Sequence, residues 1–298
     1  ADAYPEAERQ RAYAQQDAQR IGPAWGLQAG IEVSPDNDGG DLQANAARRE
    51  RLGHYLPAVW QFNGEWFWAL DRLDMLEQRL RDQDLIAGDE PIARFDAGKA
   101  DLPSITGDTL EFFFSFRSPY SYLAAERVRE SHKELGCDLH IRPVLPMAMR
   151  GFVIPKAKRM YIVRDVYRLA QQQGRSFGLI ADPVGAGAER CLKTFTIAKG
   201  VEQQLDFLVS ASRGVWAQGI DVATDKGLRL VSERAGLEGA AVQAVVAKGD
   251  LSQAEENRQA LFDAGLWGVP GYCIGDFATW GQDRFWMIGQ VLKGRSMI

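Results

Sequence analysis

A serine-proline helix start that directly follows a phenylalanine-rich run limits the folds open to this chain. Residues 110–116, Leu-Glu-Phe-Phe-Phe-Ser-Phe, have the composition of a buried β-strand, and residues 122–128 follow a helical pattern. Serine is a favoured N-cap and proline a favoured first helical residue, so Ser118 is predicted to stand where the strand becomes a helix. The positive end of the helix dipole would stabilise an anion or thiolate there. For this stretch alone an ordinary helix start is the simpler interpretation, so a functional one needs support elsewhere.

Composition describes an ordinary globular protein without an obvious macromolecular partner. The chain has 298 residues, of which 46% are hydrophobic and 25% charged, enough for one large domain or two smaller ones. Its 35 Lys and Arg against 40 Asp and Glu give a net charge of −5, which argues against nucleic-acid binding. No apolar run is long enough for a membrane span and the start lacks a signal-peptide pattern, so a cytoplasmic protein is expected.

Cysteine and histidine spacing argues against metal and dithiol chemistry. The three cysteines are odd in number, far apart and free of Cys-x-x-Cys spacing: Cys137, Cys191 and Cys273. The histidines fall in no ligand spacing either: His54, His132 and His140. We therefore expect no metal and no disulfide framework.

Breakers and periodicity divide the chain into two regions joined by a linker. Residues 1–87 are predicted to contain helices and one hairpin: a helix over 6–21, a Gly/Asp/Asn-rich loop over 35–40, a helix over 41–52, a hairpin over 58–68 that turns at Asn63-Gly64, and a helix over 71–81. Residues 88–107 lack periodicity and are predicted to form the linker.

The second region, residues 108–298, is predicted to be α/β. The strand over 110–116, its helix and a strand over 138–145 predict a right-handed parallel β-α-β unit. A helical insert over about 150–265 follows, with helices predicted over 155–172, 187–199, 201–216, 226–234, 238–248 and 253–264. The chain then returns to two short strands, 271–274 and 277–280, and a closing helix over 283–292.

An internal repeat links the two regions. Residues 51–61, followed by Trp68, Asp71 and Arg72, align with residues 264–274, followed by Trp280, Asp283 and Arg284. This alignment places Pro57 on Pro270 and needs a one-residue insertion or deletion before the tryptophans. The first copy lacks a counterpart of the serine-proline stretch. Residues 1–87 are therefore predicted to be a partial repeat of the second region's fold, without an active-site serine.

Four stretches together resemble a known family over roughly residues 108–293. They are residues 114–123 (Phe-Ser-Phe-Arg-Ser-Pro-Tyr-Ser-Tyr-Leu), residues 154–161 (Ile-Pro-Lys-Ala-Lys-Arg-Met-Tyr), residues 268–270 (Gly-Val-Pro) and residues 280–284 (Trp-Gly-Gln-Asp-Arg). The chain resembles 2-hydroxychromene-2-carboxylate isomerases and kappa-class glutathione transferases, in the DsbA-like thioredoxin superfamily. This implies a thioredoxin-like fold with a large helical insertion, preceded here by the partial repeat.

The resemblance implies that Ser118 is the catalytic residue and contacts the sulfur of glutathione, the implied cofactor. Ser118 and Ser121 have the spacing of a Cys-x-x-Cys pair in a thioredoxin-like redox protein, but neither is cysteine, so a dithiol oxidoreductase is disfavoured. A hydroxyl donor at a helix N-terminus would favour a thiolate over a thiol. Val269-Pro270 resembles the cis-proline segment of this fold, whose backbone pairs with the cysteinyl part of glutathione.

Three further residues are implied to bind glutathione. Asp283, beside Gln282, would meet the γ-glutamyl ammonium, and Lys158 would meet an anionic carboxylate. The alternatives are an ordinary helix cap for Asp283 and a solvated surface charge for Lys158.

An aromatic substrate pocket is expected from Tyr120, Trp267 and Trp280, although aromatic residues at this density are more often core. Arg117 departs from the small or apolar residue expected before the serine. If Arg117 points into the cleft, it would alter the charge preference of the site.

We therefore expect a glutathione-dependent isomerase that acts on an aromatic or unsaturated carboxylate in aromatic degradation, with a thiolate stabilised by Ser118. One alternative is a kappa-class-like transferase that uses the same thiolate. Another is a non-catalytic thioredoxin-fold binding or chaperone-like module, in which the partial repeat offers a docking or dimerisation surface. A homodimer is expected, with no nucleic-acid or membrane partner.

Overall fold

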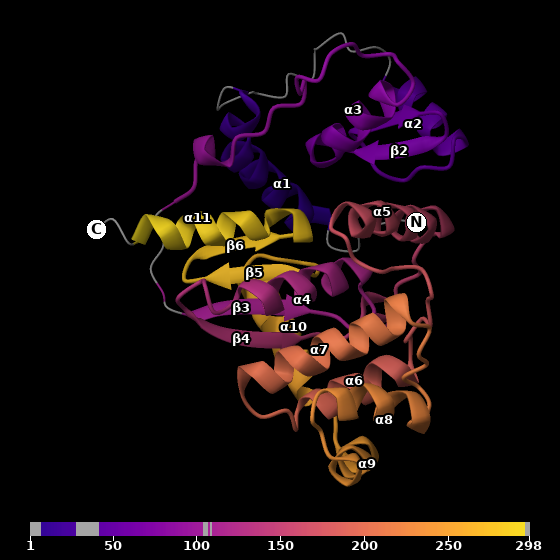
Figure 1. Ribbon diagram of the computed structural model, residues 1–298, viewed down its shortest axis with the longest axis vertical. Coiled ribbons are helices and arrows are strands. Elements are labelled where there is room, and N and C mark those ends of the chain that lie inside the picture. Colours follow the sequence, from indigo (N-terminus) through magenta and orange to yellow (C-terminus); the bar gives the residue numbers. More distant parts are fainter. Residues whose placement is uncertain (1–6, 28–41, 104–106, 108, 296–298) are drawn as a thin grey trace. The chain divides into compact units, whose positions relative to one another are not determined.

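The chain forms two compact units in a computed structural model (Figure 1). The structure describes residues 7–27, 42–103, 107 and 109–295. Of the described residues, those within Ala14–Leu102 and Ile154–Tyr161 form an amino-terminal unit, and those within Tyr4–Tyr13, Pro103–Val153 and Ile162–Ile298 form a sheet unit. The helices α1 (Ala7–Ile21) and α5 (Lys156–Gln172) therefore contribute residues to both units, whereas the sequence placed no boundary inside either helix.

The sheet unit is built on four strands in the order β4-β3-β5-β6. Strand β3 (Thr109–Phe114) pairs in parallel with β4 (Asp138–Pro143), and α4 (Pro119–Ser131) connects them as predicted. Strand β5 (Gly271–Ile274) runs antiparallel to β3, and β6 (Phe277–Trp280) completes the sheet. The hairpin leads through a 3₁₀ turn, η5 (Gln282–Arg284), into α11 (Phe285–Arg295).

Phenylalanine side chains of β3 explain why this strand is central. Phe112, Phe113 and Phe114 are fully buried, and successive side chains point to opposite faces of the sheet. The Phe112 ring stacks on Tyr272 of β5, with centroids 5.4 Å apart, while Phe113 joins a core on the other face. Burying each such ring contributes about 2 to 3 kcal/mol. The run that looked like a buried strand in the sequence is one because both of its faces are covered.

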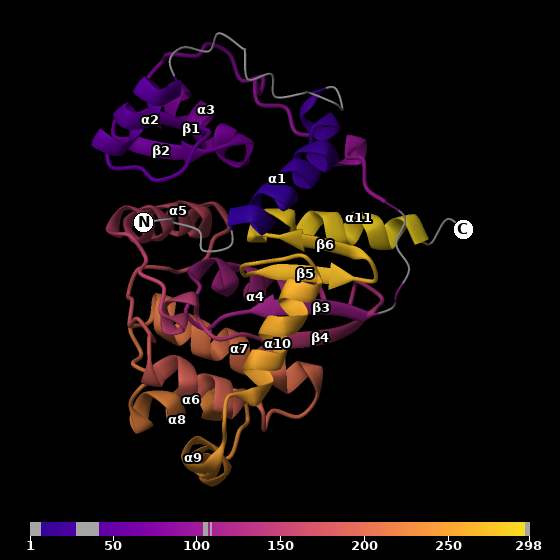
Figure 2. The same ribbon diagram turned by 180° about the vertical axis from the view of Figure 1, so that it is seen from behind.

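Helices cover both faces of this sheet. Figures 1 and 2 show α4 and α10 (Ser252–Asp263) on opposite faces. The predicted helical insert is present, and its remaining helices are α6 (Ala186–Phe195), α7 (Gly200–Ala217), α8 (Asp225–Arg234) and α9 (Gly239–Lys248). A short 3₁₀ turn that the sequence did not predict, η4 (Met147–Arg150), lies between β4 and α5.

The amino-terminal unit contains the predicted hairpin between two helices. Its elements are η1 (Pro23–Trp25), α2 (Leu42–Arg51), β1 (Val59–Phe62), β2 (Glu65–Trp68), η2 (Leu70–Arg72), α3 (Leu73–Arg81) and η3 (Ala97–Lys99). Asn63 and Gly64 both have positive φ at the hairpin turn, as that sequence pair favours. The predicted loop over 35–40 lies outside the described residues.

Part of the predicted linker is bound within this unit. The Glu77 carboxylate accepts hydrogen bonds from the backbone amides of Ile92 and Ala93, and the Asp96 amide donates to the carbonyl of Ala24 at 2.8 Å. The part of the predicted linker from residue 88 to Leu102 accordingly belongs to the amino-terminal unit.

The two segments compared in the sequence share a succession of helix, hairpin, 3₁₀ turn and helix. After each hairpin a backbone amide closes the same hydrogen bond at 2.8 Å, from Ala69 to the Ala58 carbonyl and from Gly281 to the Pro270 carbonyl. Ala58, and not Pro57, therefore corresponds to Pro270, and no insertion or deletion is needed. The sequence alignment was wrong in this register, and the common origin of the segments stays a prediction.

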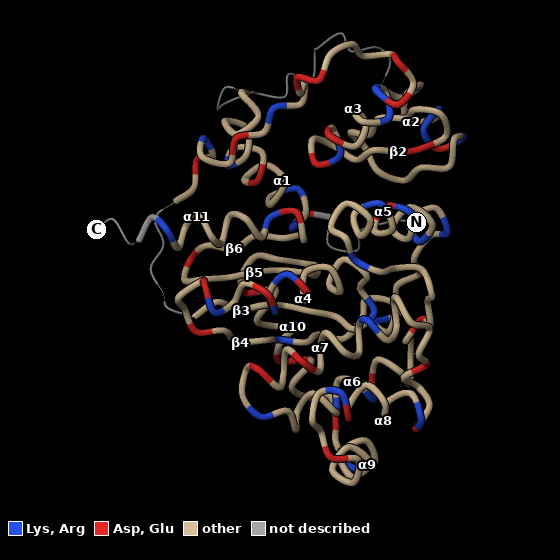
Figure 3. Tube along the Cα trace, in the orientation of Figure 1, with Lys and Arg blue, Asp and Glu red and all other residues tan. Residues whose placement is uncertain are grey.

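Neither surface charge nor helix hydropathy points to a particular binding partner. Figure 3 shows basic and acidic residues interspersed along the helices of the sheet unit. Within the described part of the chain, no helix has the length and apolar character that crossing a membrane requires.

Candidate functional site

Ser118 caps the helix that follows the central strand, as predicted. Strand β3 ends at Phe114, and Pro119 is the first residue of α4. The Ser118 Oγ accepts a hydrogen bond of 3.1 Å from the amide of Ser121, in the manner of an N-cap. A serine hydroxyl also carries one proton to donate, and no acceptor for that proton lies among the described residues. The cap therefore leaves the donor of Ser118 available to a ligand.

The peptide bond between Val269 and Pro270 is cis, which confirms the expected resemblance to the cis-proline segment. Strand β5 starts at the next residue, and Gly271 pairs with Phe113 near the end of β3. The cis bond thus lies at the same end of the sheet as the start of α4. In the described part of the chain, neither the amide nor the carbonyl of Val269 has a hydrogen-bond partner. Both groups can pair with an extended ligand.

Gln282 and Asp283 follow β6 at this same end, because Trp280 pairs with Gly271. The side chain of Arg127 in α4 donates to the Gln282 carbonyl at 3.0 Å, which joins this turn to the helix that Ser118 caps.

The Gln282 side chain is buried and engaged with the protein. Its amide oxygen accepts from the Gln173 side chain at 3.2 Å, and its amide nitrogen donates to the Asp283 carboxylate. The geometry therefore favours Gln282 as a residue that orients Asp283, which is half-buried.

Two of the three expected pocket residues lie together. The Trp267 and Trp280 ring centroids are 4.8 Å apart, but Trp267 is only 2% exposed and belongs to a buried core cluster. Tyr120 instead donates its hydroxyl to the buried Asp165 carboxylate of α5 at 2.8 Å. The structure thus gives Trp267 a core position, which was the alternative interpretation.

Arg117 is committed to an ion pair that sequence analysis missed. Its guanidinium donates to both carboxylate oxygens of Asp182, each at 2.8 Å, and the Val184 amide also bonds to that carboxylate. The charge next to Ser118 is therefore balanced within the protein. Asp182 lies in a loop without periodicity, so no local signal connects it to Arg117.

Lys158 belongs to the amino-terminal unit. Its side chain is buried, and its Nζ lies 5.9 Å from the centroid of the Tyr55 ring. Burial lowers the pKa of the Lys158 amine to about 8. The alternative of a solvated surface charge is therefore wrong, and glutathione binding by Lys158 stays a prediction.

The depressed pKa of Lys158 predicts a pH dependence of stability. Between about pH 8 and the ordinary lysine pKa of 10.5, the unfolded chain binds the Lys158 proton more often than the folded protein does. The free energy of unfolding should therefore rise with pH over this window, because the unfolded state holds more protons. Lys158→Met should lack this increment, measured by urea unfolding at pH 7.5 and 9.5. Equal pH dependence in both proteins would contradict the expectation.

These features define a thioredoxin-like protein with a serine in place of the first redox cysteine. The DSBA-like thioredoxin domain family matches residues 109–293, and the chain belongs to that family. The resemblance inferred from the four stretches is confirmed, as is the fold with its helical insertion.

Curated relatives match about three fifths of this chain. A 2-hydroxychromene-2-carboxylate isomerase of Sphingobium xenophagum is 28% identical over 190 residues, which cover 59% of this chain and 93% of the relative. One of Pseudomonas putida is 26% identical and covers 60% of this chain and 91% of the relative. A solved 2-hydroxychromene-2-carboxylate isomerase structure covers 63% of this chain and 96% of its own, with 27% identity and a TM-score of 0.53. These likenesses support an enzyme.

Proposed function

We propose that the protein is a glutathione-dependent isomerase of an aromatic or unsaturated carboxylate, similar to 2-hydroxychromene-2-carboxylate isomerase. The observation that carries this proposal is the hydroxyl of Ser118, which caps α4 through a lone pair and keeps its proton available. The isomerase relatives support the reaction class.

The residues at this end of the sheet fit glutathione. The Val269 amide and carbonyl suit a strand-like pairing with a tripeptide, because neither group has a partner in the described chain. The Asp283 carboxylate, oriented by Gln282, suits an ammonium group. Glutathione, when bound, would supply a thiolate that adds reversibly to an unsaturated substrate.

The chain's own main contribution to this reaction is the stabilisation of the thiolate by Ser118. Its hydroxyl would donate to the sulfur of bound glutathione, and the N-terminus of α4 would place a positive partial charge beside that sulfur. Both interactions are stronger with a thiolate than with a thiol, so both lower the pKa of the bound thiol. The Arg117 charge adds little to this effect, because Asp182 already neutralises it.

Calorimetry with reduced glutathione tests the proposal directly. We expect saturable binding, and isomerisation of 2-hydroxychromene-2-carboxylate that depends on added glutathione. Binding with formation of a stable conjugate, and no isomerised product, would favour the transferase alternative. Absence of glutathione binding would overturn the proposal and favour a non-catalytic module.

The homodimer and the cytoplasmic location stay predictions. Sedimentation of the purified chain measures the first, and cell fractionation measures the second.

A further inference from the structure

We propose that Tyr13 of α1 is a positioning residue that holds the Val269–Pro270 segment in the conformation required for glutathione binding. This inference rests on the function proposed above. It brings into the site a residue that lies well before the family domain, which begins at residue 109. The start of α1, through Tyr13, nevertheless belongs to the sheet unit.

The Tyr13 hydroxyl closes the outer edge of the sheet. It accepts a hydrogen bond of 2.9 Å from the Trp280 amide, and it lies 3.0 Å from the Thr279 Oγ1. It also donates toward the Trp280 carbonyl at 3.3 Å. Because β6 is the last strand of this sheet, no further strand of the sheet pairs with the backbone amides and carbonyls on its outer edge. Tyr13 therefore fixes Trp280, the residue that pairs with Gly271 beside the cis bond.

The Tyr13 ring packs against both tryptophans that flank this segment. Its centroid lies 5.2 Å from Trp267 and 6.3 Å from Trp280, both with edge-on geometry. Val269 packs against the same core cluster, which contains Tyr13 and Trp267. A Cβ built on Gly268 would lie 3.0 Å from the indole nitrogen of Trp280, so the backbone there rests closely on that ring. The segment before Pro270 thus lies on a surface that Tyr13 helps to build.

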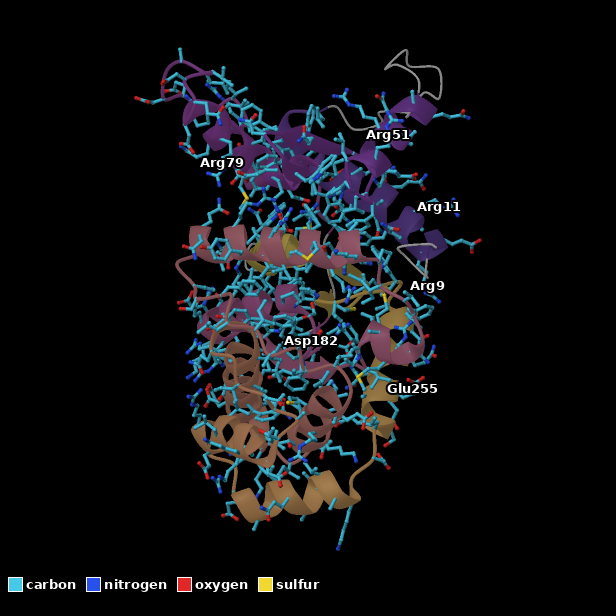
Figure 4. The ribbon with its side chains drawn as sticks, turned by 90° about the vertical axis from the view of Figure 1, so that its right-hand side faces the viewer. Arg9, Arg11, Arg51, Arg79, Asp182 and Glu255 are labelled. Carbon is cyan, nitrogen blue, oxygen red and sulfur yellow. The ribbon has the colours of Figure 1, made fainter. Side chains whose placement is uncertain are left out.

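A second contact anchors the same turns of α1 to the sheet unit. The Arg9 guanidinium, labelled in Figure 4, donates to the Phe262 carbonyl at 2.7 Å. The same guanidinium lies 5.0 Å from the centroid of the Phe262 ring. Phe262 is in the last turn of α10, which leads directly to Trp267. The start of α1 is therefore attached to the chain on both sides of the cis bond.

The Tyr13→Phe variant isolates the hydroxyl because it keeps the ring. Loss of the Tyr13 hydroxyl leaves the Trp280 amide without its acceptor, so the segment beside it is held less firmly. We therefore expect the dissociation constant for reduced glutathione to rise about tenfold. Tyr13→Ala, which also removes the ring, should weaken binding at least as much. With saturating glutathione, kcat for Tyr13→Phe should stay within about twofold of wild type, because Tyr13 acts through Val269 and does not touch the reacting atoms.

Tyr167→Phe is the matched control. Tyr167 lies in α5 within the sheet unit, is 50% exposed and should bind glutathione like wild type after loss of its hydroxyl. Calorimetry below the unfolding temperature, combined with thermal melting, separates positioning from stability. Wild-type affinity in folded Tyr13→Phe, with only a lowered melting temperature, would overturn the positioning role. A wild-type protein that binds no glutathione would instead overturn the proposed function, and the two failures are told apart by the wild-type titration. If Tyr13→Ala does not fold, Tyr13→Phe alone decides.

Discussion

Ser118→Ala is expected to lower kcat/KM for the glutathione-dependent reaction by about 10- to 100-fold. A hydrogen bond to a charged group contributes about 1.5 to 3 kcal/mol, and here the charge is the proposed thiolate. Because the hydroxyl proton of Ser118 has no acceptor in the described chain, its full strength is available to the sulfur. The pKa of bound glutathione should rise in the variant, so activity should recover partly at higher pH. Steady-state kinetics across pH with saturating glutathione measure both effects.

The same substitution removes a helix cap, so the chemical effect needs a matched control. Thr224 caps α8 in the same way, and its Oγ1 accepts from the Gly227 amide at 3.0 Å. Thr224→Ala and Ser118→Ala should each lose about 1 kcal/mol of stability, as loss of a cap typically does. Only Ser118→Ala should alter the reaction. Equal activity in the two variants would reduce Ser118 to an ordinary helix cap.

Local signals predicted the framework of the site because each is written in consecutive residues. The phenylalanine run predicted β3, the serine-proline pair predicted the start of α4, and Asn63-Gly64 predicted the turn of the first hairpin. Local preferences of single residues determine these features, through side-chain hydrogen bonding at the serine cap and through backbone conformation at the Asn-Gly turn. They place Ser118 correctly without any knowledge of the tertiary fold.

Features that depend on contacts distant in sequence were not predicted. Asp182 follows its partner Arg117 by 65 residues, and Tyr13 is separated from Thr279 by 266. Neither side chain differs from ordinary loop or helix residues until the fold brings its partner near. The alignment of Pro57 with Pro270 was wrong for a related reason, because residue identity does not fix the register that backbone hydrogen bonds determine.

Burial also changed the interpretation of several polar and aromatic residues. Trp267 is an aromatic residue of the kind that lines substrate pockets, but it is a core residue. Lys158 is of a residue type usually found on the surface, but it is buried. A sequence shows which side chains can carry a function. It does not show which of them water reaches.

Burial also predicts different effects on stability for the substitution of two aspartates that each pair with an arginine. Asp165 has no exposed surface and accepts hydrogen bonds from Tyr120 at 2.8 Å and Arg168 at 3.0 Å. Asp206 accepts from Arg129 at 2.8 Å, but its side chain is 43% exposed. The distances alone would predict similar effects. The burial of Asp165 makes the difference, because water cannot replace the carboxylate there.

Asp165→Ala should therefore destabilise the protein by about 3 to 5 kcal/mol, because it removes the fully buried carboxylate that the half-buried Arg168 guanidinium and the Tyr120 hydroxyl face. Asp206→Ala should cost less than about 1 kcal/mol, since water solvates the remaining arginine. Urea unfolding followed by circular dichroism measures both. Tyr120 is the second residue of α4, so Asp165→Ala should also weaken glutathione binding at Ser118, while Asp206→Ala should not. Equal losses of stability in the two variants would show that burial does not set the strength of the Asp165 interactions.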